Sequence, residues 1–419
     1  MAVDYFCRRC GEGGRQYADG ECVRCVLAQR LDDLLAGEHG DIPAEMMPVR
    51  HALGGVDHPI SVIGWLRRSE AARLLARLAR MEEPITHSLL DELPPSRTLY
   101  YIRDVLVHTG VLEQRNEYLE RVGPWLDDVL VGRPSDHVRL VRPFANWYVL
   151  RRARRRARTR PFTAGSGAVA RSLIRNALTF LAWLADRGET LDTIVQTDVD
   201  QWLCTGSADR YEIRYFLLWA ADHGLCAGLT VPRRPVGAGG SILDEDDRWR
   251  QLKRCLDDHA LPQDVRAAGA LVSLFGLTLS AITRFTVDHL VRQDKGVRLI
   301  IDKSPVILPP RLADLLIGLA GTARSSSAVG RAIPGTDWLF PGRAPGRHIT
   351  ADYLNTKLIA AKIRVRPTRN AALFALAEDL PAAVLADLLG MHVNTAERWA
   401  KLARRDWADY LQARTETPT

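Results

Sequence analysis

Residues 380–403, "LPAAVLADLLGMHVNTAERWAKLA", predict two helices joined by a sharp turn. Pro381 suits the first turn of a helix. The first helix has an apolar face with helical spacing, made by Val384, Leu385, Leu388 and Leu389. Gly390 can adopt the left-handed backbone conformation that ends a helix abruptly. The stretch therefore predicts a helical corner centred on Gly390.

The second helix of this corner carries polar residues at its start. Asn394 is a suitable N-cap, and Glu397 three residues later completes a capping box. We expect the apolar positions Val393, Ala396 and Ala400 to pack inward. The polar residues expected to face outward are Thr395, Glu397, Arg398 and Lys401, and the candidate DNA contacts are Asn394, Thr395, Arg398 and Lys401. This arrangement is typical of a helix-turn-helix, whose second helix meets bases and phosphates with its early residues. Short corners of this kind also occur in plain helical cores.

Composition indicates a cytoplasmic globular protein of several domains. The chain has 419 residues and a net charge of +7, which is compatible with nucleic acid as a partner. Its longest apolar stretch, residues 267–282, is shorter than a membrane span and contains serine and threonine. We therefore expect a buried helix there, no membrane contact and no export signal at the N-terminus.

Four cysteines near the N-terminus have the spacing of a zinc knuckle pair. Cys7, Cys10, Cys22 and Cys25 form C-x2-C-x11-C-x2-C. Two such knuckles supply a closed tetrahedral set of thiolates, so the predicted zinc is structural. Two disulfides are the alternative, which a reducing cytoplasm disfavours. Cys204, Cys226 and Cys255 lack this spacing and are expected in the core.

Residues 149–162, "VLRRARRRARTRPF", concentrate positive charge. The arginines are Arg151, Arg152, Arg154, Arg155, Arg156, Arg158 and Arg160, called the arginine segment below. On a helix they would cover most of the circumference and repel one another unless a polyanion neutralised them. We therefore predict contact with DNA phosphates. A solvated charged helix is the alternative.

The rest of the chain is mostly helical in pattern. "SRTLYYIRDVLVHTGVLEQR" (96–115) predicts an amphipathic helix capped by Ser96 and ended near Gly110. "ARSLIRNALTFLAWLADRG" (170–188) predicts another that stops at Gly188. Its apolar face is expected to comprise Leu173, Ala177, Phe180, Leu181 and Leu184. Residues 232–241, "PRRPVGAGGS", predict a linker.

The order of these segments resembles the tyrosine recombinases of the phage-integrase and Xer type. Residues 163–231 resemble the family's core-binding domain, a helical bundle that clamps DNA. The resemblance continues through "RAAGALVSLFGLTLSAITRFTVDHLV" (266–291), "GVRLIIDKSPVILPPRLADLLIGL" (296–319), "TDWLFPGRAPGRHITADYLNTKL" (336–358) and "RVRPTRNAALFALAEDLPAAVLADLLGMHVNTAERW" (364–399). These look like the family's first catalytic helix, β-hairpin, Leu-Phe-Pro loop and closing His-x-x-Arg and Gly-His segments.

The resemblance also implies positions for the family's catalytic residues. In that family a tyrosine attacks the DNA phosphate, and arginines, a lysine and histidines surround this phosphate. Here Thr278 stands in place of the first arginine, and Trp399 and Ala400 stand where the tyrosine is expected. The vestigial candidates are Lys303, Arg366, Arg369, His392 and Tyr410. Tyr410 could serve only if the residues before it were looped out.

Together these patterns predict a mainly α protein in four parts. They are a zinc-binding segment (1–35), a helical domain (36–145), a SAM-like core-binding domain (146–236) and a catalytic-like domain with a small β-hairpin (240–419). The favoured function is double-stranded DNA binding in recombination, integration or site binding, with self-association on DNA, without a small-molecule substrate and without strand cleavage. An active recombinase using Tyr410, a helix-turn-helix regulator and a protein-interaction scaffold are the alternatives.

Overall fold

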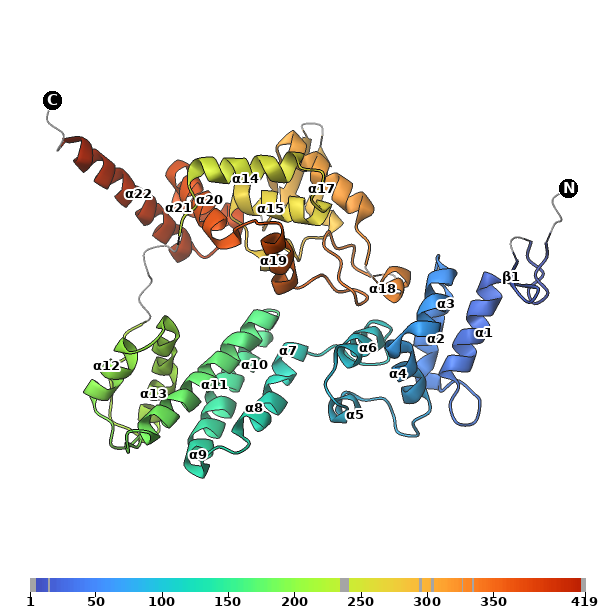
Figure 1. The fold of residues 1–419 in the computed structure, drawn as a ribbon, viewed down its shortest axis with the longest axis horizontal. Coiled ribbons are helices and arrows are strands. Elements are labelled where there is room, and N and C mark those ends of the chain that lie inside the picture. The colour runs from blue at the N-terminus through green and yellow to red at the C-terminus, as the bar shows by residue number, and fades with distance from the viewer. Residues whose placement is uncertain are drawn as a thin grey trace. The chain divides into compact units, whose positions relative to one another are not determined.

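The computed structural model describes residues 5–13, 16–233, 241–293, 296–302, 305–325, 327–333 and 335–415. The fold is mainly helical, with a small antiparallel sheet (Figure 1). The chain forms two compact units, which are described separately below. Unit 1 comprises Met1–Glu113 together with Gly239–Thr419, and unit 2 comprises Gln114–Ala238.

The N-terminal part of unit 1 begins with a short hairpin of β1 (Gln16–Ala18) and β2 (Glu21–Cys22). Its helices are α1 (Val23–Leu35), η1 (Ala44–Met46), α2 (Met47–Gly54), α3 (Pro59–Arg68), α4 (Glu70–Ala79), α5 (His87–Glu92) and α6 (Arg97–His108). Ser69, Thr86 and Ser96 each cap a helix by accepting a hydrogen bond from a first-turn N–H. The predicted cap at Ser96 is therefore confirmed.

The core of these N-terminal helices extends into the C-terminal part of the chain. Leu31, Leu75 and Ile102 are fully buried in it. Val329 and Ile333 belong to the same cluster although they come from the segment around α18 (Ala328–Ala332). Apolar burial therefore docks α18 onto the N-terminal helices, which explains why the two distant segments form one unit.

Unit 2 is a helical bundle. Its elements are α7 (Glu117–Glu120), α8 (Val122–Leu130), α9 (Ser135–Pro143), the π-helix η2 (Phe144–Leu150), α10 (Arg151–Ala157), α11 (Ala164–Ala185), α12 (Gln196–Cys204), η3 (Ala208–Glu212) and α13 (Ile213–Asp222). Pro143 lacks the N–H that would bond one turn back, and the helix continues after it in the wider π geometry. Phe180 and Trp202 pack edge to face in the core of the unit.

The C-terminal part of unit 1 surrounds the buried helix α15. Its helices are α14 (Glu245–Asp257), α15 (Gln263–Phe275), α16 (Leu279–Ile282), η4 (Val287–His289), α17 (Pro310–Thr322), α18, α19 (Ala351–Ala360), α20 (Val365–Asp379), α21 (Ala382–Leu389) and α22 (Val393–Thr415). The antiparallel sheet has the order β3 (Leu290–Gln293), β4 (Gly296–Ile300) and β5 (Pro305–Ile307). Leu299 on β4 pairs with Leu290 and Val306 and is fully buried.

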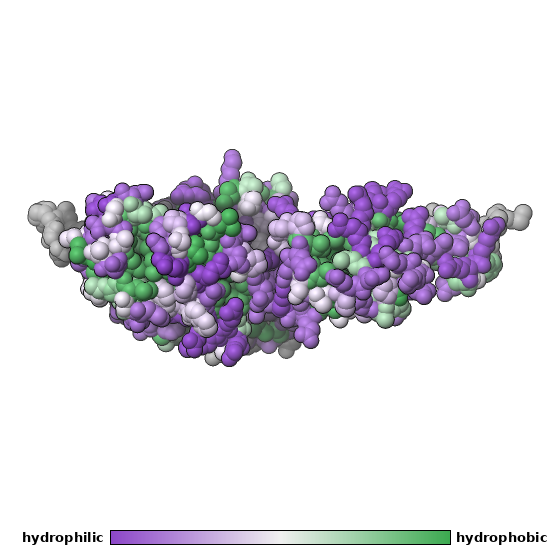
Figure 2. Space-filling model, turned by 90° about the horizontal axis from the view of Figure 1, so that it is seen from below, coloured by the Kyte–Doolittle hydropathy of each residue, from purple (hydrophilic) through white to green (hydrophobic). Residues whose placement is uncertain are grey.

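These observations confirm a mainly α fold with a small sheet. The first part of the long apolar stretch is the buried helix α15, as predicted, but the helix ends at Phe275 and residues 279–282 form the separate short helix α16. Within the described residues, no helix is long and apolar enough to cross a membrane. Hydrophilic residues cover much of the face in Figure 2, interspersed with apolar ones. Position 145 lies in the core of unit 2, and residues 1–113 cluster with 239–419. The four expected domains stay a prediction.

Candidate nucleic-acid interface and metal site

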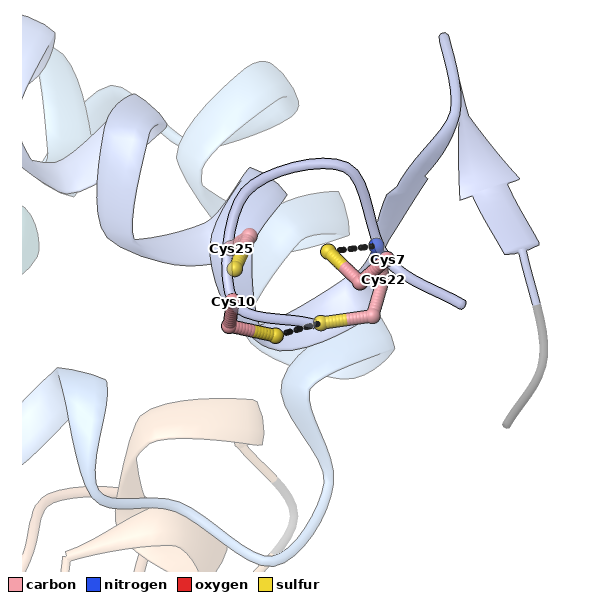
Figure 3. Close-up of side chains that lie close together, drawn as sticks. All are labelled: Cys7, Cys10, Cys22 and Cys25. Atoms are coloured by element: carbon pink, nitrogen blue, oxygen red, sulfur yellow. Dashed lines mark hydrogen bonds between the residues drawn. The ribbon is translucent and has the colours of Figure 1, made fainter. Parts of the chain in front are cut away.

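The four N-terminal cysteines lie together at the tip of unit 1. Their sulfurs are all within 4.8 Å of one another, and the side chains turn toward a common centre (Figure 3). Cys7 and Cys10 come from a turn closed by the bond from the N–H of Gly11 to the carbonyl of Cys7. Cys22 and Cys25 come from the end of β2 and the first turn of α1. The spacing thus produces the predicted cluster of thiols.

The geometry of this cluster fits a tetrahedral metal site. The Sγ atoms of Cys10 and Cys22 are 3.8 Å apart, and Zn–S bonds of about 2.3 Å would place tetrahedral sulfurs about 3.8 Å apart. The backbone N–H of Cys22 donates to Cys7 Sγ at 3.2 Å. Backbone N–H groups of Cys10 and Cys22 lower the pKa of the Cys7 thiol to about 6, whereas burial raises the pKa of the Cys25 thiol. The fit to a metal therefore rests on the distances between the sulfurs.

The remaining cysteines are free thiols that differ in burial. Cys255 is buried, Cys226 is half-buried and Cys204 is exposed. The prediction that all three belong to the core is wrong for Cys204, because it lies at the C-terminal end of α12, where the helix leaves the bundle.

All seven side chains of the arginine segment are exposed. Ala153 is buried and Ala157 is partly buried against the core of unit 2, so the apolar face of α10 is made of small residues. Among the described residues, none of the seven arginines forms an ion pair with a carboxylate. Arg152 donates to the Tyr148 hydroxyl at 2.7 Å and stacks over that ring at 5.0 Å. The segment therefore presents dense positive charge to solvent.

An aromatic side chain accompanies this charge. Trp147, one turn before Arg151 on η2, is 70% exposed. The other tryptophans of unit 2 are buried or partly buried in its core, so the exposed indole beside the arginine segment stands out. Arginine together with an exposed aromatic ring is a combination that nucleic-acid surfaces use.

Thr278, which the resemblance places at the family's first arginine, lies on a loop whose backbone approaches Arg369. Thr278 is exposed and caps α16 by accepting from the N–H of Ala281 at 3.2 Å. Two residues earlier, Gly276 has φ +60, and a Cβ placed there would lie 3.2 Å from the Arg369 carbonyl. The loop of Thr278 therefore approaches the turn of α20 that carries Arg369.

Arg369 is half-buried on α20, whereas Arg366 is exposed. Within the described residues, the Nε of Arg369 is buried and has no hydrogen-bond partner. Burial lowers the pKa of the Arg369 guanidinium, and the nearby positive charge of Arg398 lowers it further. Two close arginines and an unsatisfied donor form a site that suits an anion.

The helical corner has the predicted turn but a different cap. Gly390 adopts the left-handed conformation with φ +61 and ends α21. His392, not Asn394, caps α22, since its Nδ1 accepts from the N–H of Asn394 at 3.2 Å. The helix thus begins earlier than predicted. The predicted inward position of Val393 is also wrong, because this side chain is 42% exposed.

The candidate DNA-reading residues of the corner lie largely in solvent. Asn394, Arg398 and Lys401 are exposed and Thr395 is half-buried. Ala396 is fully buried beneath them, as predicted. These side chains therefore occupy the outer face of the first turns of α22.

Trp399 fills the place where a nucleophilic tyrosine was expected. It is 5% exposed and belongs to the core cluster of the C-terminal part. Its indole nitrogen is buried and has no hydrogen-bond partner among the described residues. The side chain thus contributes apolar packing to α22.

Two further candidate catalytic residues, Lys303 and Tyr410, do not lie beside Arg369 and Arg398 in the described part of the chain. Lys303 is outside the described residues, although its neighbour Asp302 lies against Gly390, where a Cβ would be 2.9 Å from the Asp302 Cβ. Tyr410 lies on α22, which runs without interruption past α20 and α21 (Figure 1). With a rise of about 1.5 Å per residue, Tyr410 follows Trp399 by roughly 16 Å along the helix. The residues between them are helical and are not looped out.

Comparison with known proteins gives distant structural similarities. No family model and no curated protein matches the chain. XerH site-specific recombinase bound to palindromic difH substrate, in a post-cleavage complex, is 12% identical, with a TM-score of 0.43 over 72% of this chain and 97% of that chain. XerA recombinase is 14% identical, with a TM-score of 0.31 over 71% of this chain and 99% of that one. At these levels of similarity, membership of the tyrosine recombinases stays a prediction.

Proposed function

We propose that this chain binds double-stranded DNA on a tyrosine-recombinase-like scaffold and does not cut it. The observation that carries the proposal is the arginine segment, whose seven exposed side chains have no carboxylate partner among the described residues. A surface of this charge density attracts a polyanion, and DNA supplies regularly spaced phosphates whose counterions are released on binding.

Arg369 supplies a second contact in this proposal. A positive charge that is partly buried without a partner is unfavourable until an anion arrives. A backbone phosphate offers an oxygen to the unsatisfied Arg369 Nε, and its negative charge offsets the repulsion that Arg369 feels from Arg398. The phosphate site of the scaffold would then be kept for binding.

The outer face of α22 would read sequence. Asn394, Arg398 and Lys401 project from its first turns, and such side chains form hydrogen bonds with base edges when a helix enters the major groove. Thr395 would add a hydroxyl contact. Phosphate contacts by the arginine segment would determine the affinity for DNA, and base contacts by α22 would determine the preferred DNA sequence.

Strand cleavage is not part of the proposal. Trp399 has no oxygen to attack phosphorus, and Thr278 offers no positive charge to stabilise a phosphorane. Tyr410 lies farther along an uninterrupted helix. The protein would then act by binding DNA in recombination, in integration or in regulation at a fixed site. It would self-associate on the DNA.

Zinc at the four cysteines completes the proposal. Four thiolates leave no open coordination position, so the ion would tie the first turn to the start of α1 and supply no chemistry. The ion would hold the segment before β1 against the rest of unit 1.

A single binding experiment tests the proposal. The affinity of the full chain for duplex DNA is measured over a range of salt concentrations. The proposal expects a steep linear fall of log K with log salt, with a slope of about −0.9 for each phosphate contacted. Absence of binding at low salt would favour a protein-interaction scaffold instead.

A further inference from the structure

A pocket in unit 1 lies where the N-termini of α4 and α6 meet the loop between α18 and α19. Its volume is about 330 Å³. Three arginines line it, and we call it the arginine pocket: Arg68 at the end of α3, Arg97 at the start of α6, and Arg343 in the loop. None of these residues belongs to the surfaces proposed above to bind DNA.

The three arginines are not neutralised by the protein. All three are exposed, and among the described residues none of them forms an ion pair. Glu70 also lines the pocket without pairing with any of them. Three positive charges and one negative charge therefore share the pocket, and the excess is positive.

Arg343 is held in place by a buried contact. Its guanidinium lies 5.3 Å from the centre of the Tyr101 ring, and Tyr101 is 7% exposed. The Tyr101 hydroxyl is 3.3 Å from Ser327 Oγ, which donates to the Arg343 carbonyl at 2.6 Å. These contacts hold the backbone of Arg343 and orient its side chain, so this arginine is positioned before a ligand binds.

The helix ends add to the positive potential. The helices α4 and α6 have 10 and 12 residues, long enough for a partial positive charge at each N-terminus. Ser69 and Ser96 satisfy one N–H in each first turn. An anion entering the pocket would therefore meet three guanidinium groups and two helix dipoles.

We propose that the arginine pocket binds a phosphate group. A guanidinium group donates two parallel hydrogen bonds to two oxygens of a phosphate. A phosphate has enough oxygens to bind several arginines, whereas a carboxylate can form such a pair of bonds with only one arginine. The phosphate is carried either by a DNA strand or by a free nucleotide. If the phosphate belongs to DNA, the inference rests on the proposed function. If it belongs to a free nucleotide, the inference is independent of that function, because the pocket shares no residue with the arginine segment.

The test uses the full chain with Arg68→Ala, Arg97→Ala and Arg343→Ala as separate variants. Arg77→Ala is the matched control, because Arg77 is an exposed arginine of α4 outside the pocket. One arm titrates deoxyadenosine 5′-monophosphate and inorganic phosphate by calorimetry. The other arm measures duplex DNA binding against salt.

Each pocket variant is expected to weaken binding about tenfold in at least one arm, the loss expected for a charge-assisted hydrogen bond. An effect on DNA alone, with a shallower salt slope, identifies a strand phosphate. An effect on the nucleotide identifies a free ligand. If all three variants match Arg77→Ala in both arms, the proposal is wrong. A variant with Arg154, Arg155 and Arg156 changed to Ala tests the proposed function separately, because it leaves the pocket intact.

Discussion

Arg398 lies close enough to Arg369 for its charge to add to the effect of burial, and together they lower the pKa of the Arg369 guanidinium. Arg369 lies on α20 and Arg398 lies on α22, the helices that precede and follow α21. The Nε of Arg369 has no partner among the described residues. This pair is therefore unfavourable in the free protein and favourable once a phosphate binds.

Replacing Arg369 separates stability from binding. Arg369→Met removes a buried unsatisfied donor, so we expect the free energy of unfolding in urea to rise by about 1 kcal/mol. DNA affinity should fall about tenfold, because a charge-assisted contact is lost. Arg366→Met, at an exposed position on the same helix, is the control for both readings. A less stable Arg369→Met protein would contradict the assignment of an unpaired anion site.

Replacing Arg154, Arg155 and Arg156 with Ala should weaken binding to all DNA sequences alike. Each lost phosphate contact reduces the salt slope by about 0.9, so the log–log plot should become shallower. Arg139→Ala is a control, because this exposed arginine of unit 2 pairs with Asp136. An unchanged slope in the triple variant would remove the arginine segment from the DNA surface.

Arg398→Ala should change sequence preference more than overall affinity. Loss of a bidentate base contact costs about 1–3 kcal/mol at one base pair and relaxes specificity there. Selection from a randomised duplex pool measures the change. Arg404→Ala, at an exposed position farther along α22, should retain the preference of the unmodified protein. A uniform loss of affinity for Arg398→Ala would assign Arg398 to phosphate only.

Purified protein should contain one zinc per chain, and Cys7→Ser should lose it. Because the four thiolates hold the first turn to α1, removal of zinc by a chelator should lower the melting temperature. Cys204→Ser is the control, since Cys204 is an exposed thiol outside the cluster. Metal analysis and thermal unfolding provide the readings. Full zinc content in Cys7→Ser would show that the ion binds elsewhere.

The sequence predicted those features whose cause is local. The left-handed turn at Gly390, the cap at Ser96 and the clustering of four cysteines each follow from residues close together in the chain. The cap of α22 was predicted at Asn394, but the imidazole of His392 takes that role. The side chains of His392 and Asn394 can both accept a hydrogen bond from a first-turn N–H. Which of them caps the helix depends on the backbone conformation of the turn, which the sequence does not give.

Features that depend on distant segments could not be predicted. The arginine pocket joins residues from α3, α6 and the loop before α19, and no spacing in the sequence connects them. The docking of α18 onto the N-terminal helices is of the same kind, since Val329 and Ile333 look like ordinary apolar residues. The apolar pattern also overestimated burial at helix ends, as Val384 and Val393 illustrate.

The most direct test of DNA binding without cleavage uses a nicked suicide duplex that traps any covalent protein–DNA intermediate. The duplex is incubated with the full chain at low salt, and binding and adduct formation are measured on the same samples. We predict saturable, salt-dependent binding with no adduct, and identical behaviour for Tyr410→Phe. An adduct that forms with the unmodified protein and disappears in Tyr410→Phe would contradict the account.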